Sequence, residues 1–308
     1  MSVVYWVARA GIPAAARTPV PVRHALASTA TSASYLGWRS KRQVTQENFA
    51  RVMNLPASDL RVKRAALASW SNYGRTVASL VCLPYLDLAD VDARTVDLTE
   101  GMTWQESLRL ALAPGKGTII TTGHFGSWDL AGAVVARHVP LSAIADTFTD
   151  PRLDSLLQGY RRGRGVHSIP VSHAARRGTQ ELTQGRALAI VADRPVERGV
   201  EVTFFGQRTR VPSGSATLAV NTGAAIMPGY MWHAVNNRFY LRAFPPIFPR
   251  RLSDRAERRE EIQRLTQYVL SCQEEVVRSC ATQWFMFRRF WFAEDASSPI
   301  PAMSAPAA

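Results

Sequence analysis

The sequence predicts an α/β fold in which a central mixed or mostly parallel sheet is covered by helices and preceded by a helical N-terminal segment. Two observations carry this prediction. From about residue 104 onward, short apolar runs of strand length alternate with longer segments of helical periodicity. From residue 3 to about residue 83, the pattern is helical. Strands that alternate with helices form a sheet whose two faces are both covered.

The expected strands and helices follow in chain order. The strands are short apolar runs at 117–122, 142–145, 166–170, 187–192, 225–231 and 239–244. The helices are periodic segments at 104–112, 127–137, 151–162, 174–184, 213–222 and 253–279. Serines stand where two of these helices begin, Ser127 in one case and Ser213 or Ser215 in the other. We expect them to be N-caps, because a serine oxygen accepts a free N–H of the first turn.

Length and composition fit one large domain. The chain has 308 residues and is 46% hydrophobic, which is enough to bury a full core. No internal repeat or low-complexity linker divides it, so we expect a single domain over 1–292, with its helical N-terminal segment at about 1–83. Residues 293–308 are small and rich in proline, which predicts a disordered tail.

The charge of the chain favours an anionic partner. The formal net charge is +13, and three of the 37 basic residues are lysines, so nearly all are arginines. Arginine suits planar recognition of phosphate and carboxylate groups, although a solvated charged face is the commonest explanation for any single cluster. A nucleic-acid-binding protein would also be basic, but the sequence contains no zinc finger, RNP motif or basic zipper. We therefore expect no nucleic-acid partner.

The hydropathy pattern favours a membrane surface over a membrane span. No stretch reaches the roughly 18 apolar residues of a spanning helix, and a signal peptide is not evident, so we expect the body of the protein on the cytoplasmic side. Apolar and aromatic residues at 3–8 and 26–38 stand beside Arg9, Arg17 and Arg23. This pattern fits helices that lie in a membrane interface, and it fits a pair of core helices equally well.

His124 and Asp129 are the candidate catalytic residues. His124 follows the strand expected at 118–122, so it stands at the carboxyl end of a strand, where α/β proteins usually bind their ligands. We expect Asp129, in the first turn of the next helix, to be held by the helix dipole and to turn one oxygen toward His124. The other imidazole nitrogen is then free to take a proton from a hydroxyl. The alternative is a histidine that merely forms a hydrogen bond within a turn.

This segment resembles the H-x-x-x-x-D motif of the glycerolipid and lysophospholipid acyltransferase superfamily. It resembles more closely the branch that holds the bacterial lipid A late acyltransferases and the mycobacterial phosphatidylinositol mannoside acyltransferase. Other stretches resemble the same branch in order and approximate spacing over roughly 35–292. These stretches are 41–52, 192–195, 199–206, 212–216, 222–228 and 283–289.

The resemblance implies a direct acyl transfer. The donor would be acyl-CoA or acyl carrier protein, and the acceptor a hydroxyl of a membrane glycolipid such as a lipid A precursor or a phosphatidylinositol mannoside. Lysophospholipid or glycerol-phosphate acylation is the alternative reaction, and a non-catalytic lipid- or nucleic-acid-binding protein is the alternative class. We expect backbone N–H groups near the strand-to-helix turn to hold the oxyanion. We expect no cofactor, and a peripheral location on the cytoplasmic face of the plasma (inner) membrane.

The resemblance also implies substrate-binding residues. Arg164 corresponds to an arginine near the substrate phosphate or acceptor. Asp193, Arg194 and Glu201 correspond to positions that help to place the acceptor headgroup, with Asp193 as either an acceptor contact or a structural contact. Glu197 is the competitor of Glu201, because the loop length is uncertain. For each carboxylate, a surface loop is an equally good explanation.

Two other kinds of site are not expected. The loop 212–216 would lie beside the active site, but no G-x-S-x-G nucleophile elbow is present, which argues against a serine acyl-enzyme. His167 and His173 lie near Arg164 in sequence, but a metal site needs a better-matched ligand set. The three cysteines, which suggest neither a metal site nor a disulfide framework, are Cys82, Cys272 and Cys280.

Overall fold

The computed structural model describes residues 3–147, 149–234, 237–250 and 254–292. The first part of the chain is helical, as predicted. Its helices are α1 (Val3–Arg17), α2 (Val20–Gly37), α3 (Arg39–Met53) and α4 (Leu60–Val81). The side chains of 3–8 and the predicted disordered tail lie outside the described part.

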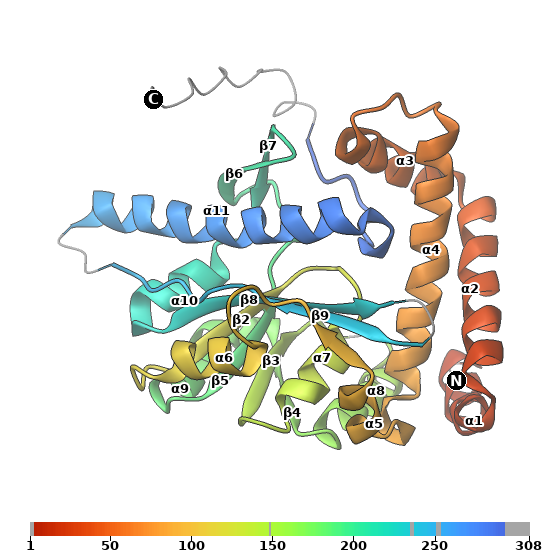
Figure 1. Ribbon diagram of the computed structural model, residues 1–308, viewed down its shortest axis with the longest axis horizontal. Coiled ribbons are helices and arrows are strands. Elements are labelled where there is room, and N and C mark those ends of the chain that lie inside the picture. Colours follow the sequence, from red (N-terminus) through yellow and green to blue (C-terminus); the bar gives the residue numbers. More distant parts are fainter. Residues whose placement is uncertain (1–2, 148, 235–236, 251–253, 293–308) are drawn as a thin grey trace.

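A seven-stranded, mostly parallel sheet forms the centre of the molecule (Figure 1). Its spatial order is β1-β9-β8-β2-β5-β3-β4, and neighbours are parallel except for β8 and β9. The strands are β1 (Thr95–Asp97), β2 (Thr118–Thr122), β3 (Leu141–Ala145), β4 (Val166–Pro170), β5 (Ala187–Val191), β8 (Ala225–His233) and β9 (Phe239–Ala243). The prediction of an α/β fold with a mostly parallel sheet is confirmed.

The remaining helices cover both faces of this sheet. They are η1 (Leu83–Tyr85), α5 (Leu88–Ala93), α6 (Trp104–Leu112), α7 (Trp128–Val135), α8 (Pro151–Arg162), η2 (Val171–His173), α9 (Ala174–Thr183), α10 (Gly214–Thr222), α11 (Arg255–Ser279) and η3 (Ala281–Gln283). Successive side chains of β2 show that both faces are buried. Ile119 packs into the core that includes α10 and α11, whereas Ile120 packs into the core that includes α6 and α7. Such two-sided burial explains why the strands are apolar runs in the sequence.

A two-stranded hairpin and the short strand β1 were not predicted. The hairpin consists of β6 (Val200–Phe204) and β7 (Gln207–Val211), and it packs on α11. β6, Val-Glu-Val-Thr-Phe, alternates apolar and polar residues, which is the pattern of a half-buried strand, so its signal was present in the sequence. β7, Gln-Arg-Thr-Arg-Val, is polar up to its last residue and carries no such pattern. β1 has three residues, two of them polar, so it lacks the hydropathy pattern of a strand. It forms because its backbone pairs with β9.

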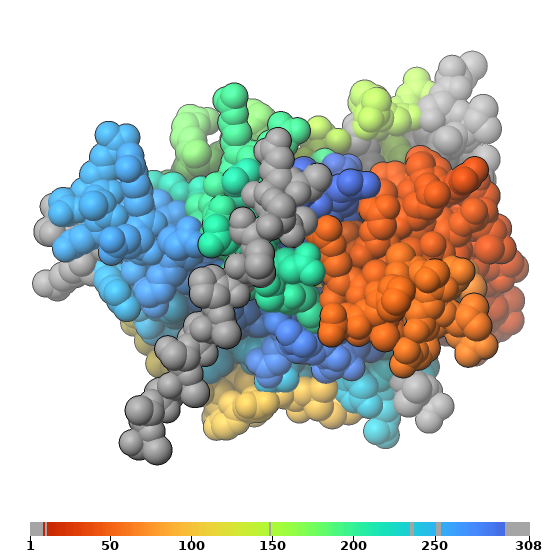
Figure 2. All heavy atoms as spheres, turned by 90° about the horizontal axis from the view of Figure 1, so that it is seen from above, coloured from red at the N-terminus to blue at the C-terminus, as the bar shows by residue number. Residues whose placement is uncertain are grey.

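The N-terminal helices, coloured red to orange, form a block at one end of the molecule (Figure 2). α2 and α4 run side by side, and α4 also reaches the centre of the molecule. There, Thr76 Oγ1 donates a hydrogen bond to the carbonyl of Gly126 (3.1 Å), and Ser69 Oγ donates one to the carbonyl of Trp284 (2.6 Å). These bonds tie the helical block to the segments around His124.

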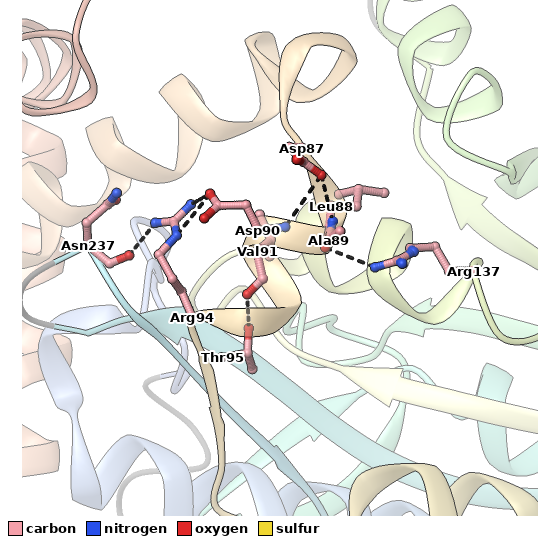
Figure 3. A network of polar contacts seen from close by, with 9 residues as sticks. All are labelled: Asp87, Leu88, Ala89, Asp90, Val91, Arg94, Thr95, Arg137 and Asn237. Carbon is pink, nitrogen blue, oxygen red and sulfur yellow. Dashed lines mark hydrogen bonds and ion pairs between the residues drawn. The ribbon is translucent and has the colours of Figure 1, made fainter.

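Polar contacts around α5 connect this short helix to its neighbours (Figure 3). Asp87 caps the helix, since its carboxylate accepts the backbone N–H of Ala89 at 2.9 Å. Arg137, just after α7, donates to the carbonyl of Leu88 at 2.9 Å. Arg94 bonds both Asp90 and the carbonyl of Asn237. The network fixes α5 between α7 and the start of β9.

Candidate active site

The turn between β2 and α7 carries His124 and is held by its backbone. The carbonyl of His124 accepts the N–H of Phe285 (2.7 Å), and the N–H of Ser127 donates to the carbonyl of Met231 on β8 (2.7 Å). Gly126 has φ of 61°, and a Cβ there would lie 2.1 Å from the Met231 carbonyl oxygen. A side chain at this position would therefore push the turn away from the sheet. The turn is fixed before any ligand binds.

Asp193 is the carboxylate that holds the His124 imidazole. Its Oδ1 lies 2.6 Å from Nδ1 of His124, and its Oδ2 accepts the backbone N–H of His124 at 2.8 Å. The two residues meet because β5 pairs with β2, which places Val191 opposite Thr122 at the carboxyl ends of both strands. Asp193 is completely buried, whereas the His124 side chain keeps 36% of its surface exposed.

The pair is electrostatically suited to a base. Burial lowers the pKa of His124, but the charge of Asp193 and the hydrogen bond to it outweigh that effect and raise the pKa above its ordinary value. Burial also disfavours the charge on Asp193. The charge interaction with His124 and the hydrogen bonds to the carboxylate nevertheless keep the pKa of Asp193 below its ordinary value. Because Nδ1 is engaged by a carboxylate, Nε2 is the nitrogen left to accept a proton.

His124 lines an apolar groove of about 440 Å³. The groove runs along β3 and β5 and past the carboxyl end of β2, between α7, α8 and α10. Its volume lies within the ~300–1,000 Å³ of small-molecule sites. Polar lining side chains include His124, Asp129, Asp146, Arg161 and Arg194, and apolar ones include Ala143, Ile144, Val166, Ala189, Ile190 and Leu218.

The orienting contact predicted for Asp129 is not formed, and this is a correction. Asp129 does lie in the first turn of α7, as predicted, and it lines the groove. Its Oδ1, however, accepts Nε of Arg161 on α8 at 2.7 Å, and both side chains are largely buried, with 9% and 13% of their surface exposed. The Arg161 guanidinium engages the Asp129 carboxylate, and Asp193 already binds Nδ1 of His124. Asp129 therefore stabilises the groove wall by linking α7 to α8. Whether it contributes to catalysis remains a prediction.

Asp193 makes the structural contact that was one of its two predicted roles, whereas Arg164 lies elsewhere than predicted. Asp193 is buried behind His124 and offers no surface to an acceptor, which was its other predicted role. Arg164 was expected near the substrate phosphate. Its guanidinium instead donates to the carbonyls of Leu83, Pro84 and Leu86 at 2.6 to 2.9 Å, and it is not part of the groove lining. Because the N–H groups of Arg164 are used by these carbonyls, Arg164 attaches η1 to the segment that follows α8.

The acidic candidates after β5 also lie away from the groove. Glu201 is on β6, 44% exposed, and forms ion pairs with Arg208 and Arg210 across the hairpin at 3.4 and 3.7 Å. It does not line the groove, so its role in placing the acceptor stays a prediction that this groove does not support. Glu197 lies in the preceding loop, as predicted, and is exposed. Arg194 does line the groove, where it pairs with Asp146 at 2.6 Å.

Three N–H groups of the turn are already engaged and are not free to hold an oxyanion. The N–H groups of His124, Gly126 and Ser127 all donate to protein acceptors. Ser127 does stand at the N-cap of α7, but its hydroxyl makes no capping bond. Ser213 likewise stands at the N-cap of α10 without a capping bond. The loop before α10 does lie beside the site, because Pro212 and Gly214 line the groove.

Sequence reasoning missed two residues of the site. Gln273 on α11 is completely buried, and its Nε2 donates to Oδ2 of Asp193 at 2.6 Å. Arg161 is one of many arginines in the sequence, and no local pattern marks it as the partner of Asp129. A buried polar residue on the apolar face of the long C-terminal helix was the available signal for Gln273, because such a residue requires a polar partner.

The chain is similar to a known protein family and to individual proteins. Residues 2–292 match the family described as bacterial lipid A biosynthesis acyltransferase. The chain belongs to this family. A phosphatidylinositol mannoside acyltransferase of Mycobacterium tuberculosis (strain ATCC 25618 / H37Rv) is 33% identical over 210 residues, which cover 66% of this chain and 65% of that protein. A protein of the same name from Mycolicibacterium smegmatis is 30% identical over 216 residues, 66% of each chain. The match thus spans about two thirds of the length of these relatives.

A solved structure was also compared. The crystal structure of a 1-acyl-sn-glycerophosphate acyltransferase from Thermotoga maritima superposes with a TM-score of 0.35 and 15% identity, covering 81% of this chain and 97% of that one. This likeness is too low to bear on the site. In the described part of the chain, none of the helices combines the length and the hydropathy needed to cross a membrane. The same residues contain no cluster of three or more His, Cys, Asp or Glu side chains that could hold a metal ion.

Proposed function

We propose that the protein transfers a long-chain acyl group from an acyl thioester, acyl-CoA or acyl carrier protein, to a hydroxyl of a membrane glycolipid such as a phosphatidylinositol mannoside or a lipid A precursor. The single observation that carries the proposal is the pairing of His124 with the buried Asp193 at the wall of an apolar groove. The family and the two mycobacterial relatives support the acyl transfer and the glycolipid acceptor.

In the proposed reaction, His124 is the general base. The acceptor hydroxyl gives its proton to Nε2 of His124 while its oxygen attacks the thioester carbonyl. Asp193 stabilises the imidazolium through Nδ1. The tetrahedral intermediate then collapses, the carbon–sulfur bond breaks, and the imidazolium returns the proton to the leaving thiolate. An ester and a free thiol are formed, and the enzyme returns to its starting state.

The groove is suited to the acyl chain of the donor. Its walls are built from apolar residues of β3 and β5, Leu141 among them, and from Gly132 and Leu218. A fatty chain that enters the groove is therefore removed from water. A second, smaller apolar cavity of about 60 Å³ shares Trp128, Gly132 and Leu141 with the groove and extends it between α6 and α7.

The first turn of α7 is the proposed oxyanion site. The first N–H groups of a helix have no partner within the helix, and they lie at the positive end of its dipole. Trp128 and Asp129 supply these groups in α7, and both residues line the groove beside His124. Arg194, which lines the groove as well, is suited to an anionic group of the donor or acceptor.

The function can be tested with the purified full-length protein. We expect transfer from palmitoyl-CoA to a phosphatidylinositol mannoside, read as an added palmitoyl mass on the glycolipid and an equal amount of free thiol. Parallel reactions use palmitoyl acyl carrier protein as donor, and a lipid A precursor, lysophosphatidic acid and glycerol 3-phosphate as acceptors. Preference for either of the last two would replace the glycolipid assignment. Absence of transfer in every combination would favour a non-catalytic lipid-binding protein.

We further propose that the protein works peripherally on the cytoplasmic face of the plasma membrane, where a soluble thioester donor meets a lipid acceptor. The outer face of α2 supports this location. Val22, Leu26, Leu36 and, at its C-cap, Trp38 are 49 to 65% exposed, and no Asp, Glu, Lys or Arg residue interrupts the helix between Arg23 and Arg39. An exposed apolar stripe next to basic residues can insert into an anionic lipid surface.

The α2 surface yields a prediction for lipid binding. Replacing Leu26 and Leu36 together with serine is expected to lower sedimentation with phosphatidylglycerol vesicles by roughly tenfold, most clearly at high salt, where charge attraction is screened within about 8 Å. The matched control is the double serine variant of Leu60 and Leu110, which are 65% and 47% exposed on other helices. If both double variants bind as the wild type does, α2 is not the docking surface.

A further inference from the structure

Gln273 lies directly behind the proposed catalytic pair. We propose that it is a positioning residue, which fixes the Asp193 carboxylate so that His124 keeps the orientation and tautomer of a general base. This inference rests on the proposed function. It is carried by one buried hydrogen bond, by the geometry of both carboxylate oxygens, and by a glycine that makes room for the Gln273 side chain.

The hydrogen bonds of Asp193 divide cleanly between its two oxygens. Oδ2 accepts Nε2 of Gln273 at 2.6 Å and the backbone N–H of His124 at 2.8 Å. Oδ1 is thereby left to Nδ1 of His124, at 2.6 Å. With Oδ2 held from two directions, the carboxylate cannot turn about its last bond without breaking a buried, charge-assisted hydrogen bond. Gln273 thus fixes the plane in which the imidazole is held.

The burial of Gln273 strengthens its hold on Asp193. Gln273 and Asp193 are both 0% exposed, so water does not compete for the bond between them. An ionised carboxylate accepts hydrogen bonds and donates none, so the amide must present its NH₂ group to Asp193. The hydrogen bond from Gln273 is also one of the contacts that favour the charged form of Asp193 against its burial. The charged form is the one that stabilises an imidazolium.

Gly123 allows Gln273 to reach the pair. A Cβ built at Gly123 would lie 2.5 Å from Nε2 and 2.6 Å from Cδ of Gln273. Gly123 is not among the glycines with positive φ, so its backbone would accept alanine and the obstacle is the Gln273 amide itself. Gly123 and Gln273, 150 positions apart in sequence, are therefore in direct contact, and a larger residue at 123 would displace the Gln273 amide.

Gln267 supplies a matched control on the same helix. Its side chain accepts the N–H of Thr203 at 2.8 Å and donates to the carbonyl of Thr203 at 2.9 Å. It thus attaches α11 to the β6–β7 hairpin and makes no contact with His124 or Asp193. A variant at Gln267 therefore measures the stability that is lost when a glutamine contact of α11 is removed and the His124–Asp193 pair is left intact.

The test compares Gln273→Met with Gln267→Met in the full-length protein. For Gln273→Met we expect kcat to fall by about 10- to 100-fold, the usual worth of a hydrogen bond to a charged group, with KM nearly unchanged. Asp193 raises the pKa of His124, so a loosened Asp193 should lower it, and the acid limb of the kcat/KM profile should move to lower pH. For Gln267→Met we expect a lower Tm with wild-type kcat and pH profile.

Two further variants separate positioning from folding. Gln273→Glu can donate to Asp193 while its new carboxyl is protonated and repels Asp193 once ionised, so its activity should fall as the pH rises through the titration of that carboxyl. Gly123→Ala should displace the Gln273 amide and lower kcat. Adding Gln273→Ser to Gly123→Ala should cost little more, because both changes break the same contact.

The outcomes are decisive in each direction. If Gln273→Met keeps the wild-type kcat and pH profile, or if the Gly123 and Gln273 changes are additive, Gln273 has a structural role alone. If the wild type shows no acyl transfer, the proposed function fails, and the positioning role is then read from the His124 imidazole by NMR titration. A pKa that is lower in Gln273→Met than in wild type and Gln267→Met supports it, and an unchanged pKa overturns it.

Discussion

Replacing His124 with alanine is expected to lower kcat/KM by a factor on the order of 10³ or more, because the general base is lost and no neighbour can replace it. Asp193 is completely buried, and Asp129 is paired with Arg161. A positioned base is worth roughly 10²–10⁴ in rate, and loss of the imidazole also leaves the charge of Asp193 inside the protein without its partner. The measurement is the initial rate of palmitoyl transfer, followed by mass spectrometry.

A folding control is required for this variant, because a buried carboxylate that loses its charged partner, here the His124 imidazole, destabilises a protein by several kcal/mol. His124→Gln keeps an amide that can donate to Asp193 while offering no basic nitrogen. We expect it to be as inactive as His124→Ala but to have a Tm closer to that of the wild type. Either variant retaining more than about a tenth of the wild-type rate, while folded, would show that His124 is not the base.

The elements of the fold could be predicted because their signals are local. The helices 104–112 and 151–162 have the predicted bounds, and the predicted strands of the sheet match within two residues. Each of these segments carries its own periodicity or apolar run, so neighbouring residues decide it. β1 is different, since it is defined by pairing with β9, more than a hundred residues later.

The site could be predicted only in part, for a related reason. His124 was identified because a strand, a turn and a helix follow one another around it. Its partner Asp193 is 69 residues away in sequence, and it arrives through the pairing of β5 with β2. Asp129 was the nearest carboxylate in sequence, but a sequence pattern does not show that α8 brings Arg161 to it. The order of strands in the sheet, which the sequence left open, decides which acid orients the base.

Asp193→Asn is expected to have the second largest effect, a loss in kcat of roughly 10²–10⁴ with little change in KM. An amide has about the size of the carboxylate, so the variant preserves packing. It carries no charge to stabilise the imidazolium, and it can donate its N–H to Nδ1 of His124, which would place the ring proton on Nε2. A histidine in that tautomer cannot accept the proton of the acceptor hydroxyl.

Asp129→Asn provides the contrast, because the two aspartates have different partners. Removing the Asp129 charge weakens the bond to Arg161, so we expect a lower Tm and a higher KM for the donor as the wall between α7 and α8 loosens. The pH profile separates the two variants. Asp193 raises the pKa of His124, so Asp193→Asn should move the acid limb of kcat/KM to lower pH, whereas Asp129→Asn should leave it in place. If Asp129→Asn instead moves the limb and costs more in kcat than Asp193→Asn, the base is oriented by Asp129 during turnover, and the resting geometry of the pair rearranges when substrate binds.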